Sequence, residues 1–253
     1  MKKFLCLFGV VAFVLTSCSS EDNIDSGNEE NLLLPKTEKY TYGSHPEDNS
    51  TVTYSYDGNK ITSLTYDKGA GQILFTYTGD LITKTVYTEN YESKIRSTTV
   101  TFIYENNKLK SLFKEKDYSN LDEKWVYTYN SDGTITCTVT DVDLVAQTEK
   151  ENWSTTFTLD ASGNIVKEVY RGGATYNYTW DKKNSPFKNI LGYKSLLNAD
   201  VFDQDINSIH NIVSTNSTYS DSSSEVTTFE NTYNESDFLI KRVNDDEIYE
   251  YTY

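Results

Sequence analysis

Thiols are the side chains with the most specific chemistry in this sequence, which contains three of them: Cys6, Cys18 and Cys137. Cys18 closes a segment in which two lysines precede an apolar run from residue 4 to residue 15. A positive end, a short apolar run and small residues make the pattern of a signal peptide, and this run is too short to span a bilayer permanently. The segment therefore predicts export. An ordinary secretory signal in which Cys18 stands by chance is one interpretation.

The run Leu15-Thr16-Ser17-Cys18 also resembles the lipobox of bacterial lipoproteins, with leucine three residues before the cysteine. The resemblance implies that residues 1–17 are a lipoprotein signal peptide and that Cys18 becomes the new N-terminus. Its sulfur would carry a diacylglycerol group and its amine an acyl chain. Two or three chains hold a protein firmly at a membrane, where one chain would not. We therefore expect an outer-membrane protein that contacts the membrane through lipid on Cys18.

A polar, acidic stretch without periodicity follows the lipid cysteine, and we expect residues 18–37 to be a disordered tether. Acidic residues directly after the cysteine resemble the surface-export signal of Bacteroidetes-type lipoproteins. That resemblance implies display on the cell surface. A solvated spacer that carries no address, with the folded part in the periplasm, is the alternative.

The third thiol is predicted to be structural. Cys6 leaves with the signal peptide, so the mature chain cannot form an intramolecular disulfide. Alternation places Cys137 on the same face as Ile135 and Val139, where cysteine behaves as a small buried hydrophobe. Nothing near it in the sequence would lower its pKa, so a nucleophilic role is not expected.

Other catalytic groups do not assemble into a recognisable motif. His45 and His210 have no partner at metal-ligand spacing, and no nucleophile elbow, phosphate loop or dinucleotide fingerprint occurs. Residues 203–207 alternate oxygen ligands as a calcium loop does, but Ser208 and Ser214 stand where glycine and glutamate are needed. The sequence predicts no enzyme, no cofactor and no metal site.

The charge of the chain excludes one class of partner. The formal net charge is −15, and removal of residues 1–17, with two lysines and no acid, makes it −17. Such a polyanion does not bind the phosphate backbone of nucleic acid. It is also repelled by an anionic membrane surface, which leaves the lipid on Cys18 as the membrane contact.

One unit recurs along the mature chain: an alternating run of aromatic residues and threonine, a tyrosine, a short turn with Asp, Asn or Gly, and then Ile or Leu. Val52–Tyr56, Asp57–Lys60 and Ile61–Leu64 form the first example. Period-two β-branched and aromatic residues favour strands, and the turns supply positive φ angles, so each unit is a hairpin. We predict one all-β domain over residues 38–253, an antiparallel meander forming a large curled sheet or partly open barrel.

The repeats are interrupted once. Asn184-Ser185 followed by Pro186, with apolar residues at helix-like intervals, predicts a short helical insertion near residues 186–200, weakened by Gly192. We expect the Asn- and Ser-rich continuation to be a loop pinned to the sheet by isoleucines such as Ile206. Such an insertion would cap one face or end of the sheet.

The unit Tyr129-Asn130-Ser131-Asp132-Gly133-Thr134-Ile135 resembles the tyrosine-aspartate (YD) hairpin repeat of RHS-type surface proteins, without the arginine usual after the turn glycine. Residues 38–253 as a whole resemble Bacteroidetes-type surface lipoproteins with a porin-like or curled β-meander domain. The resemblance implies a fold and a location and carries no activity. A membrane-spanning barrel is a further alternative, but it needs an apolar lipid-facing band, whereas the faces here carry tyrosine on one side and threonine, lysine and glutamate on the other.

Tyrosine is abundant, at 21 of 253 residues, and many tyrosines share a strand face. The favoured interpretation is a core ladder of cross-strand pairs. The alternative is an exposed platform on which sugar rings stack, built from Trp125, Tyr127, Tyr176, Tyr178 and Trp180. Two functions follow: a lipid-anchored interaction or structural protein whose partner, such as another surface protein, the sequence does not specify, which we favour, and a surface glycan-binding module.

Overall fold

The computed structural model describes residues 32–202 and 206–253. The expected signal peptide, Cys18 and residues 18–31 of the tether lie outside the described residues, as do the first three positions of the calcium-like loop. Across the part of the chain that is described, no helix is long and apolar enough to cross a membrane.

The described residues form seventeen strands in one antiparallel sheet, which confirms the predicted all-β meander. The helical turns among them are 3-10 turns: η1 (Pro46–Asp48), η2 (Asp67–Gly69) and η3 (Tyr193–Leu196). The strands are β1 (Thr37–Tyr42), β2 (Ser50–Asp57), β3 (Lys60–Tyr66), β4 (Gly71–Thr78), β5 (Leu81–Tyr91), β6 (Lys94–Glu105), β7 (Lys108–Lys116), β8 (Leu121–Tyr129), β9 (Ile135–Asp143), β10 (Thr148–Leu159), β11 (Ile165–Tyr170), β12 (Thr175–Trp180), β13 (Ile212–Thr218), β14 (Ser224–Thr228), β15 (Glu230–Tyr233), β16 (Leu239–Asn244) and β17 (Glu247–Thr252).

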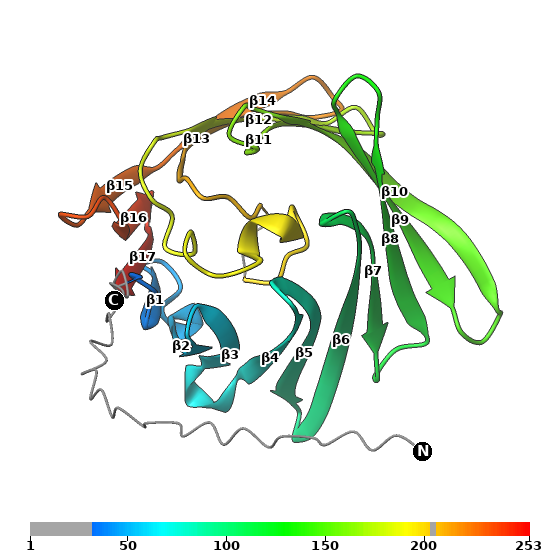
Figure 1. Cartoon of the computed structure of the whole chain (residues 1–253), viewed down its shortest axis with the longest axis horizontal. Helices are drawn as coiled ribbons and strands as arrows, with labels where there is room; N and C mark the ends of the chain where they lie inside the picture. The colour runs from blue at the N-terminus through cyan, green and yellow to red at the C-terminus, as the bar shows by residue number, and fades with distance from the viewer. Residues whose placement is uncertain (1–31, 203–205) are drawn as a thin grey trace, which may run out of the picture. The chain divides into compact units, whose positions relative to one another are not determined.

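The sheet curls into a nearly closed barrel (Figure 1). Successive strands pair with each other, and β1 pairs with both β2 and β17. The exception is the pair β14 and β15, between which the hydrogen-bond ladder is interrupted: β14 pairs with β13, and β15 pairs with β16. Only Phe229 separates these two strands, and its N–H donates to the carbonyl of Val213 at 3.0 Å. One continuous segment therefore bridges the place where the ladder is interrupted.

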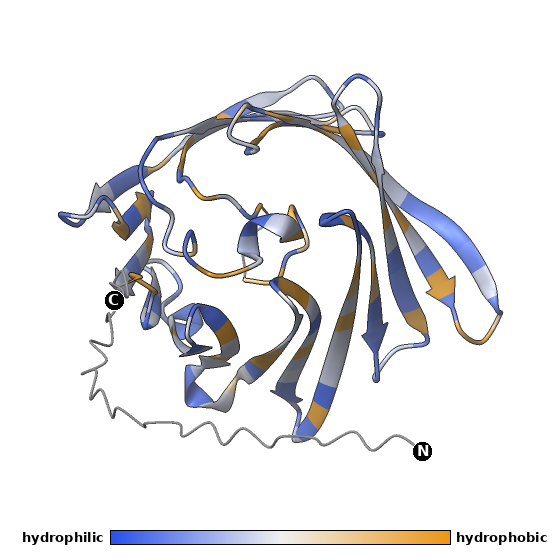
Figure 2. Cartoon of the chain, viewed as in Figure 1, coloured by the Kyte–Doolittle hydropathy of each residue, from blue (hydrophilic) through white to orange (hydrophobic). Residues whose placement is uncertain are grey.

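Alternation along the strands gives the barrel an apolar interior and a polar exterior. On β2, Val52 and Tyr54 are buried, whereas Thr53 and Ser55 between them are exposed. Hydrophobic and hydrophilic residues alternate along the strands in Figure 2. This outer face differs from that of a membrane-spanning barrel, which presents an apolar band to lipid.

The two ends of the barrel differ, and we call them the core end and the cavity end. The core end carries the turns that follow the recurrent tyrosines, such as residues 58–59 and 79–80. Near the start of the strand after each turn at this end, one aliphatic residue points inward and is at most 2% exposed, and the set comprises Ile61, Ile82, Leu109, Ile135, Ile165 and Leu239. The opposite end, with loops such as residues 117–120 and 171–174, is the cavity end.

The described residues between β12 and β13, residues 181–202 and 206–211, lie inside the barrel (Figure 1), and we call them the insert. The ring centroid of Phe187 lies 5.8 Å from that of Tyr54 on β2 and 5.4 Å from that of Phe202. Phe202 in turn stacks on Phe75 of β4 at 5.3 Å. The expected insertion is therefore present, and it covers the inner face of the curled sheet.

The helix expected near residues 186–200 is reduced to the four-residue turn η3. Gly192 before it and Leu197 after it have φ angles of 77° and 55°, which end a right-handed helix on both sides. Backbone groups of Leu191 bond to the barrel instead: its N–H donates to Asn59, and its carbonyl accepts from the hydroxyl of Tyr77. Contacts with the strands replace the hydrogen bonds that a longer helix would have made.

The last residues assigned to the tether pack on the barrel. Pro35 is buried, and the N–H of Lys36 donates to the carbonyl of Thr252 at 2.7 Å. The amide of Asn189 in the insert donates to the carbonyl of Leu33 at 3.0 Å. The prediction of disorder up to residue 37 was therefore wrong for residues 33–37, because these residues bond to the barrel at the core end and Thr37 begins β1.

Candidate functional site

The insert separates two cavities in the interior. The larger has a volume of about 600 Å³ and lies between the insert and a wall that includes β8, β10–β13, β16 and β17. We call it the aromatic cavity. The smaller, of about 420 Å³, lies between the insert and β3–β7, and we call it the lysine cavity. Asp200 of the insert lines both.

A series of four rings from four strands lines one side of the aromatic cavity. The centroids of Trp125 (β8) and Trp153 (β10) lie 5.2 Å apart, edge to face. Trp153 lies 5.8 Å from Tyr170 (β11), which lies 5.6 Å from Tyr176 (β12). All four side chains are partly exposed. Val139 of β9 is the register partner of both tryptophans, which brings them together across that strand.

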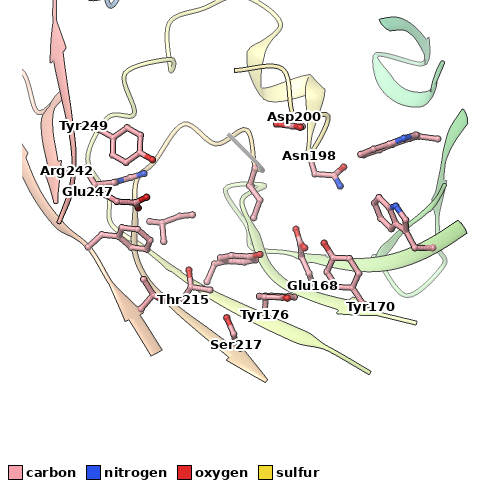
Figure 3. A pocket seen from close by; sticks show the side chains of 17 residues that line it. Glu168, Tyr170, Tyr176, Asn198, Asp200, Thr215, Ser217, Arg242, Glu247 and Tyr249 are labelled. Carbon is pink, nitrogen blue, oxygen red and sulfur yellow. The ribbon is translucent and has the colours of Figure 1, made fainter. Parts of the chain in front are cut away.

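Polar groups face these rings. Arg242, Glu247 and Tyr249 lie across the cavity from Glu168 and Tyr170 (Figure 3). The Nε of Arg242 donates to Asn231 Oδ1 at 3.2 Å, and Glu247 Oε1 accepts from the hydroxyl of Tyr40 at 2.8 Å.

The formal charge of the cavity lining is negative. Three carboxylates, Glu168, Asp200 and Glu247, and one guanidinium, Arg242, give 1 − 3 = −2. Because opposite walls carry flat rings and hydrogen-bonding groups, the arrangement suits a small ligand with both apolar and hydroxyl-bearing surfaces and disfavours an anionic one.

Two ionisable groups beside the cavity have shifted pKa values. Burial, followed by the hydrogen bond to Glu247, raises the pKa of Tyr40 well above its usual value, so that Tyr40 stays a donor to Glu247. Burial alone would raise the pKa of Glu123, but Lys116, Lys114 and Trp125 lower it below its usual value. Glu123 therefore stays a carboxylate and accepts from Trp125 Nε1 at 3.2 Å, which fixes the orientation of that ring.

The five residues of the predicted platform divide into two groups. Trp125, Tyr176 and Tyr178 line the aromatic cavity. Tyr127 is buried and donates to Asn198 Oδ1 at 3.0 Å, and the Nε1 of Trp180 donates to the carbonyl of Ile165 at 2.8 Å. The last two therefore have packing roles, and the rings that come together face the lumen.

Sequence reasoning missed Trp153, Tyr170 and the two polar residues of the insert, Asn198 and Asp200. The signal for Trp153 lies in the hairpin register, because pairing β8 with β9 and β9 with β10 places both tryptophans opposite Val139. No local pattern marks Asn198 or Asp200. Their position follows from the path of the insert through the lumen.

The remaining chemical candidates have structural surroundings. Cys137 is fully buried between Ile135 and Val139, as alternation predicted, and burial raises the pKa of its thiol to about 12. His45 Nδ1 lies 3.4 Å from Glu47, and His210 Nδ1 lies 3.1 Å from Asn164 Nδ2. Within residues 32–202 and 206–253, no three His, Cys, Asp or Glu side chains are grouped to hold a metal ion.

Comparison with known proteins gives a likeness of fold. No family model matches the chain, and no curated protein sequence matches it. A porin-like protein from Bacteroides vulgatus is 14% identical, covers 87% of this chain and 98% of its own, and has a TM-score of 0.54. A porin-like protein from Bacteroides uniformis is 13% identical, covers 86% and 96%, and has a TM-score of 0.51. The chain thus has the nearly closed, all-β meander found in these porin-like proteins.

Proposed function

We propose that this chain is a lipid-anchored protein of the outer membrane, displayed at the cell surface, that binds a small neutral glycan inside its barrel. The observation that carries the proposal is the aromatic cavity, in which four contiguous rings face a polar wall. Its volume of about 600 Å³ lies within the range of small-molecule sites, and such sites combine aromatic lining with a few polar groups. A purely structural protein has no need of such a cavity.

The chemistry of the lining favours sugar rings. A pyranose has an apolar face of C–H groups and an edge of hydroxyls, so it can pack against aromatic rings while donating to carboxylates and amides. Trp125, Trp153, Tyr170 and Tyr176 supply the rings. Glu168 and Glu247 supply acceptors, and the formal charge of −2 disfavours glycans with carboxylate or sulfate groups.

Anchoring by lipid, and not by the barrel wall, is supported by the polar outer face. Thr53 and Ser55 are typical outward residues, and outward apolar residues such as Leu74 and Ile103 are scattered. The insert also fills part of the lumen that an open channel would need. Lipid on Cys18 would hold the protein at the membrane without requiring an apolar outer face or an open lumen.

Titration of the soluble mature chain, with Cys18 replaced by serine, against neutral and acidic oligosaccharides by calorimetry tests the binding function. We expect saturable binding of at least one neutral oligosaccharide, weakened at least tenfold, about 1.4 kcal/mol, by Trp125→Ala and by Trp153→Ala. Phe113→Ala is the matched control, because this partly exposed ring on β7 lies between the inward residues Leu112 and Lys114. Absence of saturable binding, or binding that both tryptophan variants leave intact, contradicts the proposal.

The anchor is tested separately in cells. We expect Cys18→Ala to move the protein from the membrane fraction to the soluble fraction, while the unchanged protein is cleaved when protease is added to intact cells. Membrane association that survives Cys18→Ala would argue against the lipid anchor. Protection of the unchanged protein in intact cells, with cleavage after lysis, would place it in the periplasm instead.

A further inference from the structure

The inward face of β7 changes character along the strand. Leu109 and Leu112, toward the core end, are buried at 1% and 3% exposure. The next two inward positions, toward the cavity end, are Lys114 and Lys116, and both line the lysine cavity. Two ammonium groups therefore lie inside the barrel of a chain whose formal net charge is −15.

Hydroxyl groups surround the same cavity. Thr85 of β5 and Thr98 of β6 are only 4% and 7% exposed, and both line it. The Thr98 hydroxyl lies 3.2 Å from that of Tyr118. Hydroxyl-bearing side chains of β5 and β6 thus line the same cavity as the two lysines, and sites that bind oxyanions combine charge and hydrogen bonds in this way.

The two lysines differ in their partners. Lys116 Nζ lies 2.5 Å from Glu123 Oε1, and the side chains are 22% and 21% exposed. The side chain of Lys114 forms no hydrogen bond or salt bridge with any residue that the structure describes. Lys114 is the register partner of Glu123 and its charge attracts that carboxylate, but its ammonium group has no hydrogen-bond acceptor of its own. An oxyanion of a bound ligand would give the ammonium group of Lys114 a hydrogen-bond acceptor.

Negative groups limit the ligand. Glu123 balances one lysine, and Asp200 lines the cavity from the insert. The formal charge of Lys114, Lys116, Glu123 and Asp200 is therefore zero, with the positive part on the β7 side. A compact ligand with one anionic group at one end, and donors that face Asp200 at the other, matches this distribution.

We propose that the lysine cavity is a second binding site, which shares only Asp200 with the aromatic cavity and takes a small ligand through a single carboxylate, sulfate or phosphate group held by Lys114. Its volume of about 420 Å³ is within the range of small-ligand sites. The site therefore accepts the anionic chemistry that the aromatic cavity disfavours.

Calorimetric titration of the soluble mature chain with glucuronate, inorganic sulfate and inorganic phosphate, at constant ionic strength set with chloride, tests the site. We expect saturable binding of at least one of the three, weakened at least tenfold by Lys114→Gln and largely restored by Lys114→Arg. Which probe binds distinguishes the three anionic groups. Lys84→Gln is the matched control, because this lysine on β5 is exposed and precedes the inward Thr85.

Failure of this proposal is separable from failure of the glycan proposal. Lys114→Gln should leave neutral glycan binding unchanged, and Trp153→Ala, which removes a ring that lines only the aromatic cavity, should leave anion binding unchanged. No saturable binding of any probe overturns the second site. Binding that Lys84→Gln weakens as much as Lys114→Gln also overturns it, because it shows nonspecific attraction of anions to surface lysines.

Discussion

The hydroxyl of Tyr104 in one hairpin donates a 2.9 Å hydrogen bond to the backbone carbonyl of Ile82 in the hairpin before it. The register of β4 and β5 shifts at Tyr77 and Ile82, so that Thr83 has no register partner on β4. Such a bulge disrupts the strand ladder locally, and the next tyrosine supplies a hydrogen bond there. The relationship repeats along the chain, from Tyr129 to Leu109, from Trp180 to Ile165 and from Tyr253 to Leu239.

Removing the hydroxyl alone should therefore weaken the link between hairpins. We expect Tyr104→Phe to lower the free energy of unfolding by about 1–3 kcal/mol, because the Ile82 carbonyl loses its donor in a partly buried site. Urea unfolding of the soluble mature chain measures the change. Tyr91→Phe, at a position exposed near a hairpin tip, is the control and should change stability by less than about 0.5 kcal/mol. Equal effects of the two variants would contradict the structural role of the hydroxyl.

Truncation of the aliphatic partner should cost more than loss of the hydroxyl. Ile82 is fully buried, and Ile82→Ala should lower the free energy of unfolding by about 2–5 kcal/mol through lost burial and a residual cavity. Leu74→Ala on β4 is the control, because Leu74 is 48% exposed on the outer face. A large effect at Leu74 would show that the outer face is covered by something in solution.

Tyrosine ionisation should make the fold sensitive to alkali. Burial raises the pKa of Tyr77 to about 12, and burial raises the pKa of Tyr56 and Tyr104 further. Because these pKa values are raised in the folded state, the same tyrosines lose their protons at lower pH in the unfolded chain. Their contribution to the free energy of unfolding is therefore complete below pH 10 and decreases as pH rises from 10 through 12. Urea midpoints from pH 8 to pH 11.5 should fall above pH 10. Absorbance at 295 nm should show a set of tyrosines that ionise only on unfolding.

Cys137 offers a probe of core opening. Its thiol is fully buried and its pKa is raised by burial to about 12, so the native chain carrying Cys18→Ser should react with a thiol reagent at least about a hundredfold more slowly than the same chain in urea. A Cys137→Ser variant should give no signal. Fast reaction under native conditions would show that the wall formed by β8–β10 opens readily.

The sequence contained enough to predict the strands and their facing, because both depend on local alternation. Ile135, Cys137 and Val139 share the buried face that their spacing indicates. The helix expected near residues 186–200 is longer than the turn that forms, because contacts remote in sequence decide the local backbone. These contacts include the hydrogen bonds from Leu191 to the barrel, and the positive φ angles at Gly192 and Leu197 accompany them.

The candidate site was predictable only in part. Period-two spacing placed Tyr176 and Tyr178 on one face, and the same face carries the cavity. Which side of the sheet becomes the lumen depends on curvature, and the sequence pattern does not encode it. The grouping of Trp125 with Trp153 depends on the register across β9, and Asn198 and Asp200 reach the cavity only because the insert turns back into the barrel.

Pairing of β1 on both sides has a mechanical consequence for a protein held by its N-terminal segment. Strand hydrogen bonds run perpendicular to the strands, and β1 has six register partners on β17 and four on β2. A pull transmitted through Leu33 at the core end acts along the length of β1, so both ladders resist in shear and must rupture together. A pull on the proposed anchor would therefore load β1 in shear, the direction in which a sheet resists best. A pull across an edge strand would instead break its hydrogen bonds one at a time.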